Sequence, residues 1–187
     1  MTRTAARLAI ALAACSCAVA FAQSPSAQSS PVPYALAFEI TAERGEAAGF
    51  AITHSLVVEK LLGACDALRQ TLPQDPAEVL KAWSERNWER LEAAYGYLFY
   101  VREITGGRQG RAAGEAFYRN AIDEYEKRSA AGLSEVFARM EPNTVTCAKW
   151  EADLSEGRAD LDWKPQYTPV LDEIVAFHRS VVGKAKP

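Results

Sequence analysis

Apolar side chains between Phe50 and Leu72 recur at steps of three and four residues, the repeat of an amphipathic helix. The run stops at Pro73, whose ring cannot continue a helix. A helix with one apolar face buries that face against other elements, so this segment predicts a core helix. The apolar stripe consists of Phe50, His54, Val57, Val58, Leu61, Cys65, Leu68 and Leu72.

The residues that follow Pro73 predict a second helix. Asp75 suits the N-cap, Pro76 suits the first helical turn, and Glu78 stands in the capping-box position. We expect this helix to run to Thr105 and to end at Gly106-Gly107. Its second half, residues 95–101, is apolar on every side, which predicts a central helix buried all round.

The remainder of the chain repeats the same helical signals. We expect helices at 112–127, at 133–140 after a weak point at Gly132, from Asn143 or Thr144 to Gly157, and from Thr168 onward. Residues 34–41 fit either a short helix or an edge strand, and no strand is otherwise indicated. The sequence therefore predicts an all-α fold, a compact bundle of five or six helices.

The first 22 residues have the three parts of a secretory signal peptide. They contain an arginine-bearing start, an apolar run, and the cleavage-site pattern Ala20-Phe21-Ala22. An alternative is the stretch 12–15, which resembles a bacterial lipoprotein cleavage box and would make Cys15 the lipidated first residue. We expect a periplasmic or secreted protein, or a lipoprotein anchored through Cys15. Residues 23–33, rich in Ser, Gln and Pro, are expected to be a disordered leader before one helical domain at 34–187.

Two cysteines remain outside the signal segment, Cys65 and Cys147. In an oxidising compartment two such cysteines pair, so the sequence predicts one structural disulfide. Closing so long a loop stabilises the folded state by about 4–5 kcal/mol in the chain-entropy model.

Charge and composition exclude some classes of function. The chain is 49% hydrophobic and 24% charged, as globular proteins are, and its net charge of −3 lacks the basic character of a nucleic-acid binder. We expect no segment after the signal to be apolar enough to span a membrane, which takes roughly 20 residues.

Catalytic and metal-binding motifs are missing from the sequence. It has no G-x-S-x-G, no H-E-x-x-H and no P-loop, and we expect no cofactor. An enzyme is a third hypothesis, which would require a catalytic group that these motifs do not supply. His54 and His178 each lie on the apolar stripe of a helix, where they could meet as candidate metal ligands; the simpler interpretation is two histidines at the edge of the core. Asp160 and Asp162 stand in a polar stretch and are expected on a solvated face.

Three groups of residues are candidate binding sites. Arg108 and Arg111 flank a glycine-rich helix start that could hold an anion, or they belong to a flexible connector. Arg86 lies between two tryptophans and could recognise a carboxylate, or pair with an acidic residue of another helix. The tyrosine cluster is a candidate for core, interface or pocket. The aromatic members of these groups are Trp83, Trp88, Tyr95, Tyr97 and Tyr100.

These observations favour a non-catalytic exported protein that acts by binding another envelope protein, as an inhibitor, immunity factor or assembly partner does. Small size, export, one disulfide and abundant aromatic side chains motivate that hypothesis. The alternative is a helical bundle that binds a small ligand or a metal in its interior. Its candidate contacts are His54, His178, Arg86 and the tyrosines.

Overall fold

Five α-helices and one 3₁₀ helix make up the regular structure in a computed structural model, which describes residues 38–138 and 141–182. None of these residues lies in a strand. The elements are α1 (Ala42–Cys65), η1 (Asp66–Thr71), α2 (Pro76–Gln109), α3 (Arg111–Val136), α4 (Thr144–Ser155) and α5 (Thr168–Val182). The predicted all-α class is confirmed. The predicted signal peptide and leader lie outside the described residues.

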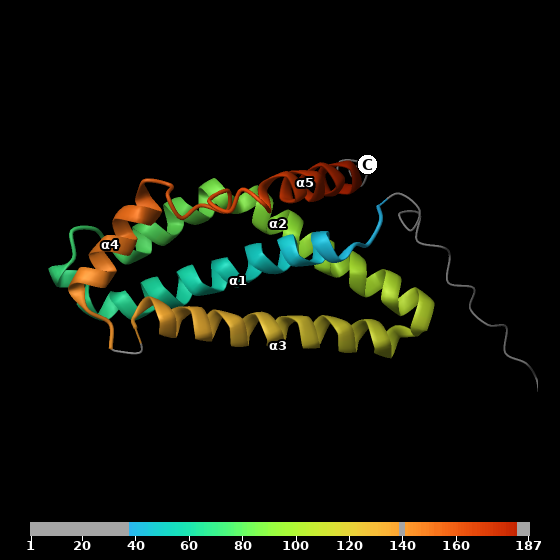
Figure 1. Cartoon of the computed structure of the whole chain (residues 1–187), viewed down its shortest axis with the longest axis horizontal. Coiled ribbons are helices and arrows are strands. Elements are labelled where there is room, and N and C mark those ends of the chain that lie inside the picture. Colours follow the sequence, from blue (N-terminus) through green and yellow to red (C-terminus); the bar gives the residue numbers. More distant parts are fainter. Residues whose placement is uncertain (1–37, 139–140, 183–187) are drawn as a thin grey trace, which may run out of the picture. The chain divides into compact units, whose positions relative to one another are not determined.

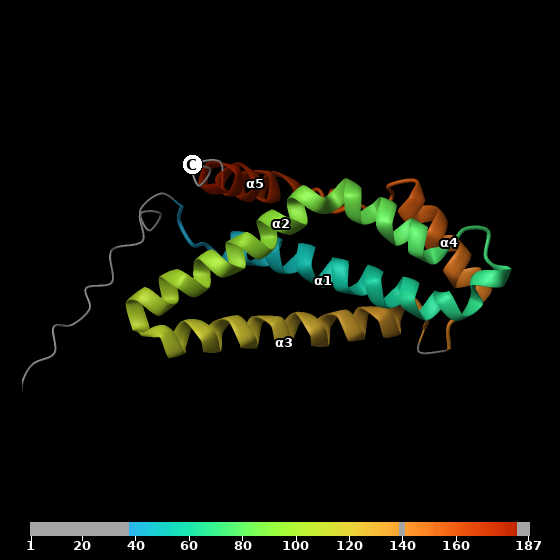
Figure 2. The ribbon, with the colours of Figure 1, turned by 180° about the vertical axis from the view of Figure 1, so that it is seen from behind.

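Helices α1 and α2 share the centre of the bundle, and both pack against α3, α4 and α5. In two opposite views α1 lies between α3 and α5 (Figures 1 and 2). The prediction that the tyrosine-rich half of α2 is buried all round is wrong, because Phe99 is 43% exposed. Its ring stacks on Tyr118 of α3 at a centroid distance of 5.0 Å, so this side of α2 lies at the surface.

Helix α1 begins eight residues before the predicted apolar stripe, in a polar stretch without helical periodicity. The Thr41 hydroxyl caps the helix by accepting a hydrogen bond from the Arg44 backbone N–H at 3.2 Å. Ala47, Ala48 and Gly49 are buried in these early turns. Small residues carry little hydrophobic signal, so the periodicity does not reveal the buried face.

Two glycine sites do not end helices as predicted. Helix α2 passes through Gly106-Gly107 and ends at Gln109, and Gly110 makes the corner with a φ of +96°. Helix α3 passes through Gly132, so the predicted break there is also wrong. Each glycine lowers helix propensity by about 1 kcal/mol relative to alanine. At Gly132 the Val57 side chain of α1 lies 3.1 Å from the position of an added Cβ, so α3 packs closely on α1 there.

The disulfide joins Cys65, the last residue of α1, to Cys147 in α4, as predicted. The two cysteines are 82 positions apart, and both side chains are fully buried. Asn143 caps α4 by accepting a hydrogen bond from the Thr146 backbone N–H at 2.9 Å. The bridge therefore ties the short α4 to the end of the core helix.

By length and composition alone, Ala42–Thr71 is apolar enough to cross a membrane, so the expectation that no segment after the signal reaches this level is wrong. Half of its most apolar window is buried inside the bundle. The core helix of a soluble protein has the same properties, so this is weak evidence for a membrane span.

Candidate functional site

The predicted Trp83–Arg86–Trp88 group does not form one site. Trp83 is 1% exposed, and its indole N–H donates to the Ala159 carbonyl at 3.0 Å. Trp88 is 61% exposed on the outside of α2. Arg86 forms two hydrogen bonds with the Asp160 carboxylate, at 3.0 and 3.1 Å. The guanidinium is thus already paired with an acidic residue, which here comes from the α4–α5 connection and not from a helix.

Asn87 completes the attachment of that connection to α2. Its side-chain carbonyl accepts the Leu161 backbone N–H at 2.8 Å, and its amide donates to Asp160 at 3.0 Å. Asp160, expected on a solvated face, is instead partly buried by these contacts. The connection is therefore held by polar contacts to α2, and this is a structural use of the residues.

The two histidines lie in different parts of the bundle. His54 lies beside Trp83, with 5.9 Å between ring centroids, whereas His178 lies against Gly96. Trp83 and Gly96 are about 20 Å apart along the same helix, at roughly 1.5 Å per residue. The expectation that the histidines could meet is wrong, and the described residues include no group of three or more potential metal ligands.

His54 serves as a neutral structural donor. Its Nε2 lies 2.9 Å from the Ala159 carbonyl oxygen, which can only accept, so Nε2 carries the proton. Burial lowers the pKa of His54, and the hydrogen bond to Ala159 only partly offsets this effect.

Arg108 and Arg111 are exposed on either side of the corner between α2 and α3. The backbone N–H groups of Ala113 and Gly114 donate to the Gly110 carbonyl. Those two amides are already hydrogen-bonded and cannot donate to an anion. Fewer backbone donors are therefore free at this helix start than the sequence predicts.

A lysine–serine contact is the arrangement closest to a catalytic pair. Lys60 Nζ lies 2.7 Å from Ser129 Oγ and also pairs with the Glu126 carboxylate. The lysine therefore shares its contacts between the serine hydroxyl and a carboxylate. Ser129 is fully buried and donates to the Glu126 backbone carbonyl, so its hydroxyl is not presented to a substrate.

The tyrosines of α2 hold the segment before α1. The Tyr100 hydroxyl donates to the Phe38 carbonyl at 2.8 Å. The Phe38 ring stacks on Phe177 of α5 at 4.2 Å and meets Tyr97 edge-on at 6.0 Å. Tyr97 is 3% exposed, while Tyr95 and Tyr100 are half-buried. These contacts of Phe38 hold the segment before α1 against α2 and α5.

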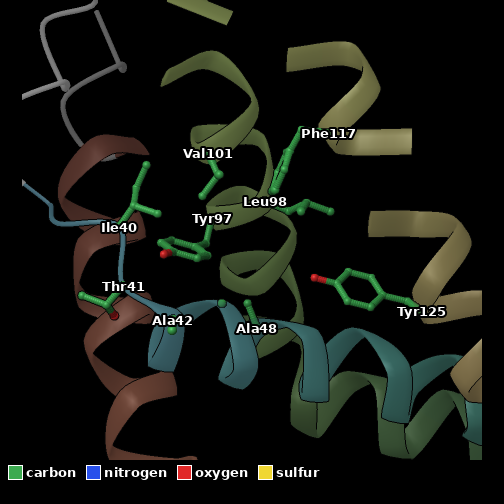
Figure 3. A pocket seen from close by; sticks show the side chains of 10 residues that line it. Ile40, Thr41, Ala42, Ala48, Tyr97, Leu98, Val101, Phe117 and Tyr125 are labelled. Atoms are coloured by element: carbon green, nitrogen blue, oxygen red, sulfur yellow. The ribbon is translucent and has the colours of Figure 1, made fainter. Parts of the chain in front are cut away.

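A hollow of about 280 Å³ lies beneath residues 40–41, where α1, α2 and α3 meet (Figure 3). It exists because the face of α1 turned toward it carries only small residues, while α2 and α3 contribute large side chains. The lining residues are Ile40, Thr41, Ala42, Gly45, Ala48, Tyr97, Leu98, Val101, Phe117 and Tyr125. No Asp, Glu, Lys, Arg or His is among them.

Two phenolic hydroxyls provide the main side-chain polarity of this hollow. The Tyr97 hydroxyl is directed toward the Ile40–Thr41 segment and has no hydrogen-bond partner among the described residues (Figure 3). The Tyr125 hydroxyl points inward from α3. Burial raises the pKa of both phenols, so both stay protonated at neutral pH. Buried hydroxyls normally form hydrogen bonds, so the Tyr97 hydroxyl marks a position where a hydrogen-bond partner is missing.

Of this lining, only Tyr97 belongs to the residues singled out in the sequence. A usable signal was the spacing of Ala42, Gly45 and Ala48, three residues apart, which places small side chains along one face of a helix. Phe117 and Tyr125 could not be assigned to this site from the pattern, because only the packing of α3 brings them there.

No protein-family model, curated protein or solved structure matches this chain.

Proposed function

We propose that this protein binds a small, predominantly apolar molecule in the hollow between α1, α2 and α3. The observation that carries the proposal is the Tyr97 hydroxyl, which is buried beside the hollow without a hydrogen-bond partner among the described residues. A bound molecule would satisfy that hydroxyl and cover the apolar side chains around it. Small-molecule sites have this composition, an apolar lining with a few polar groups.

The size of the hollow supports a ligand about as large as one substituted ring. Its 280 Å³ lies near the lower end of small-molecule sites, which span about 300–1,000 Å³. The wall residues come from three helices that also form the core, so the shape of the site depends on the fold and not on a single loop.

Gly45→Leu tests the proposal by placing a side chain at the mouth of the hollow. A Cβ at Gly45 meets nothing within 4 Å, so the variant is expected to fold. Gly63→Leu is the matched control, because Gly63 is an exposed glycine of the same helix, has equally open space and does not line the hollow. Both changes replace a helical glycine and raise helix propensity.

Ethylbenzene is the probe, titrated into the isotope-labelled full-length chain while backbone amide shifts are recorded. Saturable shifts at Ala48 and Leu98 are expected in the wild type and in Gly63→Leu, and their loss is expected in Gly45→Leu. The proposal is overturned if the wild type shows no saturable shift, or if both variants respond as the wild type does.

Binding to another envelope protein is a second proposal, favoured by the large exposed area of Trp88. Exposed tryptophans are enriched at the centres of protein interfaces. Trp88→Ala should abolish co-purification with a defined envelope protein while leaving the unfolding midpoint unchanged. Unchanged co-purification with that protein would overturn this second proposal.

A further inference from the structure

The chemistry around Tyr97 narrows the class of ligand, an inference that rests on the proposed function. We propose that the ligand is a neutral molecule whose apolar body fills the hollow and whose carbonyl-type oxygen accepts a hydrogen bond from the Tyr97 hydroxyl. The ligand class is that of small aromatic or alicyclic ketones, aldehydes and esters.

The first step concerns why the ligand offers an acceptor. The Tyr97 hydroxyl has both a proton to donate and an oxygen that accepts. Burial raises the pKa of Tyr97, so the hydroxyl keeps its proton at neutral pH. A phenolic oxygen is a poor acceptor because its lone pair is shared with the ring, whereas its proton is a good donor and has no acceptor within hydrogen-bond distance among the described residues. The missing partner is an acceptor.

The second step concerns why the ligand is neutral. The lining residues include no side chain that is charged at neutral pH. The nearby Arg44 is already engaged, because it donates to the Glu39 carbonyl at 2.7 Å and to the Glu173 carboxylate at 3.0 Å. Burying an ion without a counter-charge costs far more than burying a neutral hydrogen-bonded group. A carboxylate or an ammonium group would therefore be excluded.

The third step concerns which of the two phenolic hydroxyls, that of Tyr97 or that of Tyr125, bonds to the ligand. Tyr125 is half-buried, and its ring packs against Gly49, where an added Cβ would lie 3.0 Å from Cε1. Its hydroxyl points into the hollow but is not among the buried unpartnered atoms, so water can satisfy it. Tyr97 is consequently the residue that a ligand must satisfy, and Tyr125 contributes mainly an apolar wall.

Two probes of similar shape test this assignment, acetophenone with a carbonyl oxygen and ethylbenzene without one. Their dissociation constants are measured by amide-shift titration of the full-length wild type, Tyr97→Phe and Tyr118→Phe. Loss of one hydrogen bond predicts about a tenfold weaker affinity of Tyr97→Phe for acetophenone. The affinity for ethylbenzene should stay equal or rise. Tyr118 does not line the hollow, so Tyr118→Phe should change both affinities by less than about twofold.

The outcomes separate this inference from the proposed function. If neither probe binds the wild type, the proposed function fails. If ethylbenzene binds but Tyr97→Phe changes both affinities alike, the hollow is a ligand site and the acceptor assignment is wrong. If benzoate binds as tightly as acetophenone, the restriction to neutral ligands is wrong. An unchanged unfolding midpoint for Tyr97→Phe establishes that the variant is folded.

Discussion

Glu151 is fully buried in α4, and neither of its carboxylate oxygens has a hydrogen-bond partner among the described residues. Burial raises the pKa of Glu151 above its ordinary value of 4.5, the Gln74 backbone opposes this weakly, and the neighbouring Asp75 adds to the rise. A buried carboxyl group without a partner destabilises the fold, and the penalty grows when the group ionises. We therefore expect that replacing Glu151 stabilises the protein.

The sign of the pH dependence follows from the raised pKa. The folded chain holds this proton more tightly than the unfolded chain does, so its contribution to stability is greatest below the unfolded-state pKa. That contribution falls as the pH rises through the interval between the unfolded-state and folded-state pKa values. Glu151→Gln has no proton to lose, so its advantage over the wild type should be absent at low pH and grow through this interval.

The magnitude comes from the two unpaired oxygens. Leaving a buried polar group unsatisfied costs about 1–3 kcal/mol. Glu151→Met keeps the length of the side chain and removes both oxygens, so it should raise the free energy of unfolding by about 1–3 kcal/mol at neutral pH. In a protein of this size each 1 kcal/mol shifts the melting temperature by about 2–4 °C.

The assay is urea unfolding monitored by circular dichroism over a pH series from about 4 to 8. Glu135→Gln is the control, because Glu135 is exposed on α3 and its replacement should change stability by less than about 0.5 kcal/mol. The reasoning is refuted if Glu151→Met is less stable than the wild type at neutral pH. It is equally refuted if the Glu151→Gln advantage does not increase with pH.

Four further outcomes are read from unfolding midpoints. Trp83→Ala should cost about 3–5 kcal/mol because Trp83 fills the core, whereas Trp88→Ala should cost less than about 0.5 kcal/mol, and equal costs would contradict this placement. Gly114→Ala should cost about 1–3 kcal/mol because its Cβ would lie 2.5 Å from the Arg102 carbonyl oxygen. Gly107→Ala meets nothing within 4 Å and should stabilise by up to about 1 kcal/mol; a loss there would show that the corner needs glycine for another reason. Reducing the disulfide should cost about 2–5 kcal/mol, and an unchanged midpoint would contradict its structural role.

Local signals located the helices well where caps and large apolar residues coincide. Asp75 accepts the Ala77 backbone N–H at 2.9 Å and begins α2, and Asn143 begins α4, as their side chains indicate. The same signals failed at Gly106, Gly107 and Gly132, where the helices continue through residues of low helix propensity. They also failed at the start of α1, where the buried face consists of alanine and glycine.

The candidate site could be predicted from the sequence less well than the fold could. Tyr97 stood out as an aromatic residue in an apolar helix, but nothing in the sequence distinguished its unpartnered hydroxyl from the paired hydroxyl of Tyr100. Arg86 and Asp160 were considered separately in the sequence, yet they form one ion pair that joins α2 to the α4–α5 connection. Pairing between distant residues depends on the path of the chain, which local periodicity does not contain.

The sequence alone determined the helical class, the main helix starts and the pairing of Cys65 with Cys147, because these depend on local backbone preferences and on the number of available cysteines. The tertiary structure decided which side chains meet. It placed the small residues of α1 opposite Tyr97 and Tyr125, leaving a hollow, and it separated His54 from His178. Contacts of this kind arise from the packing of whole helices, where the volume and direction of each side chain matter together.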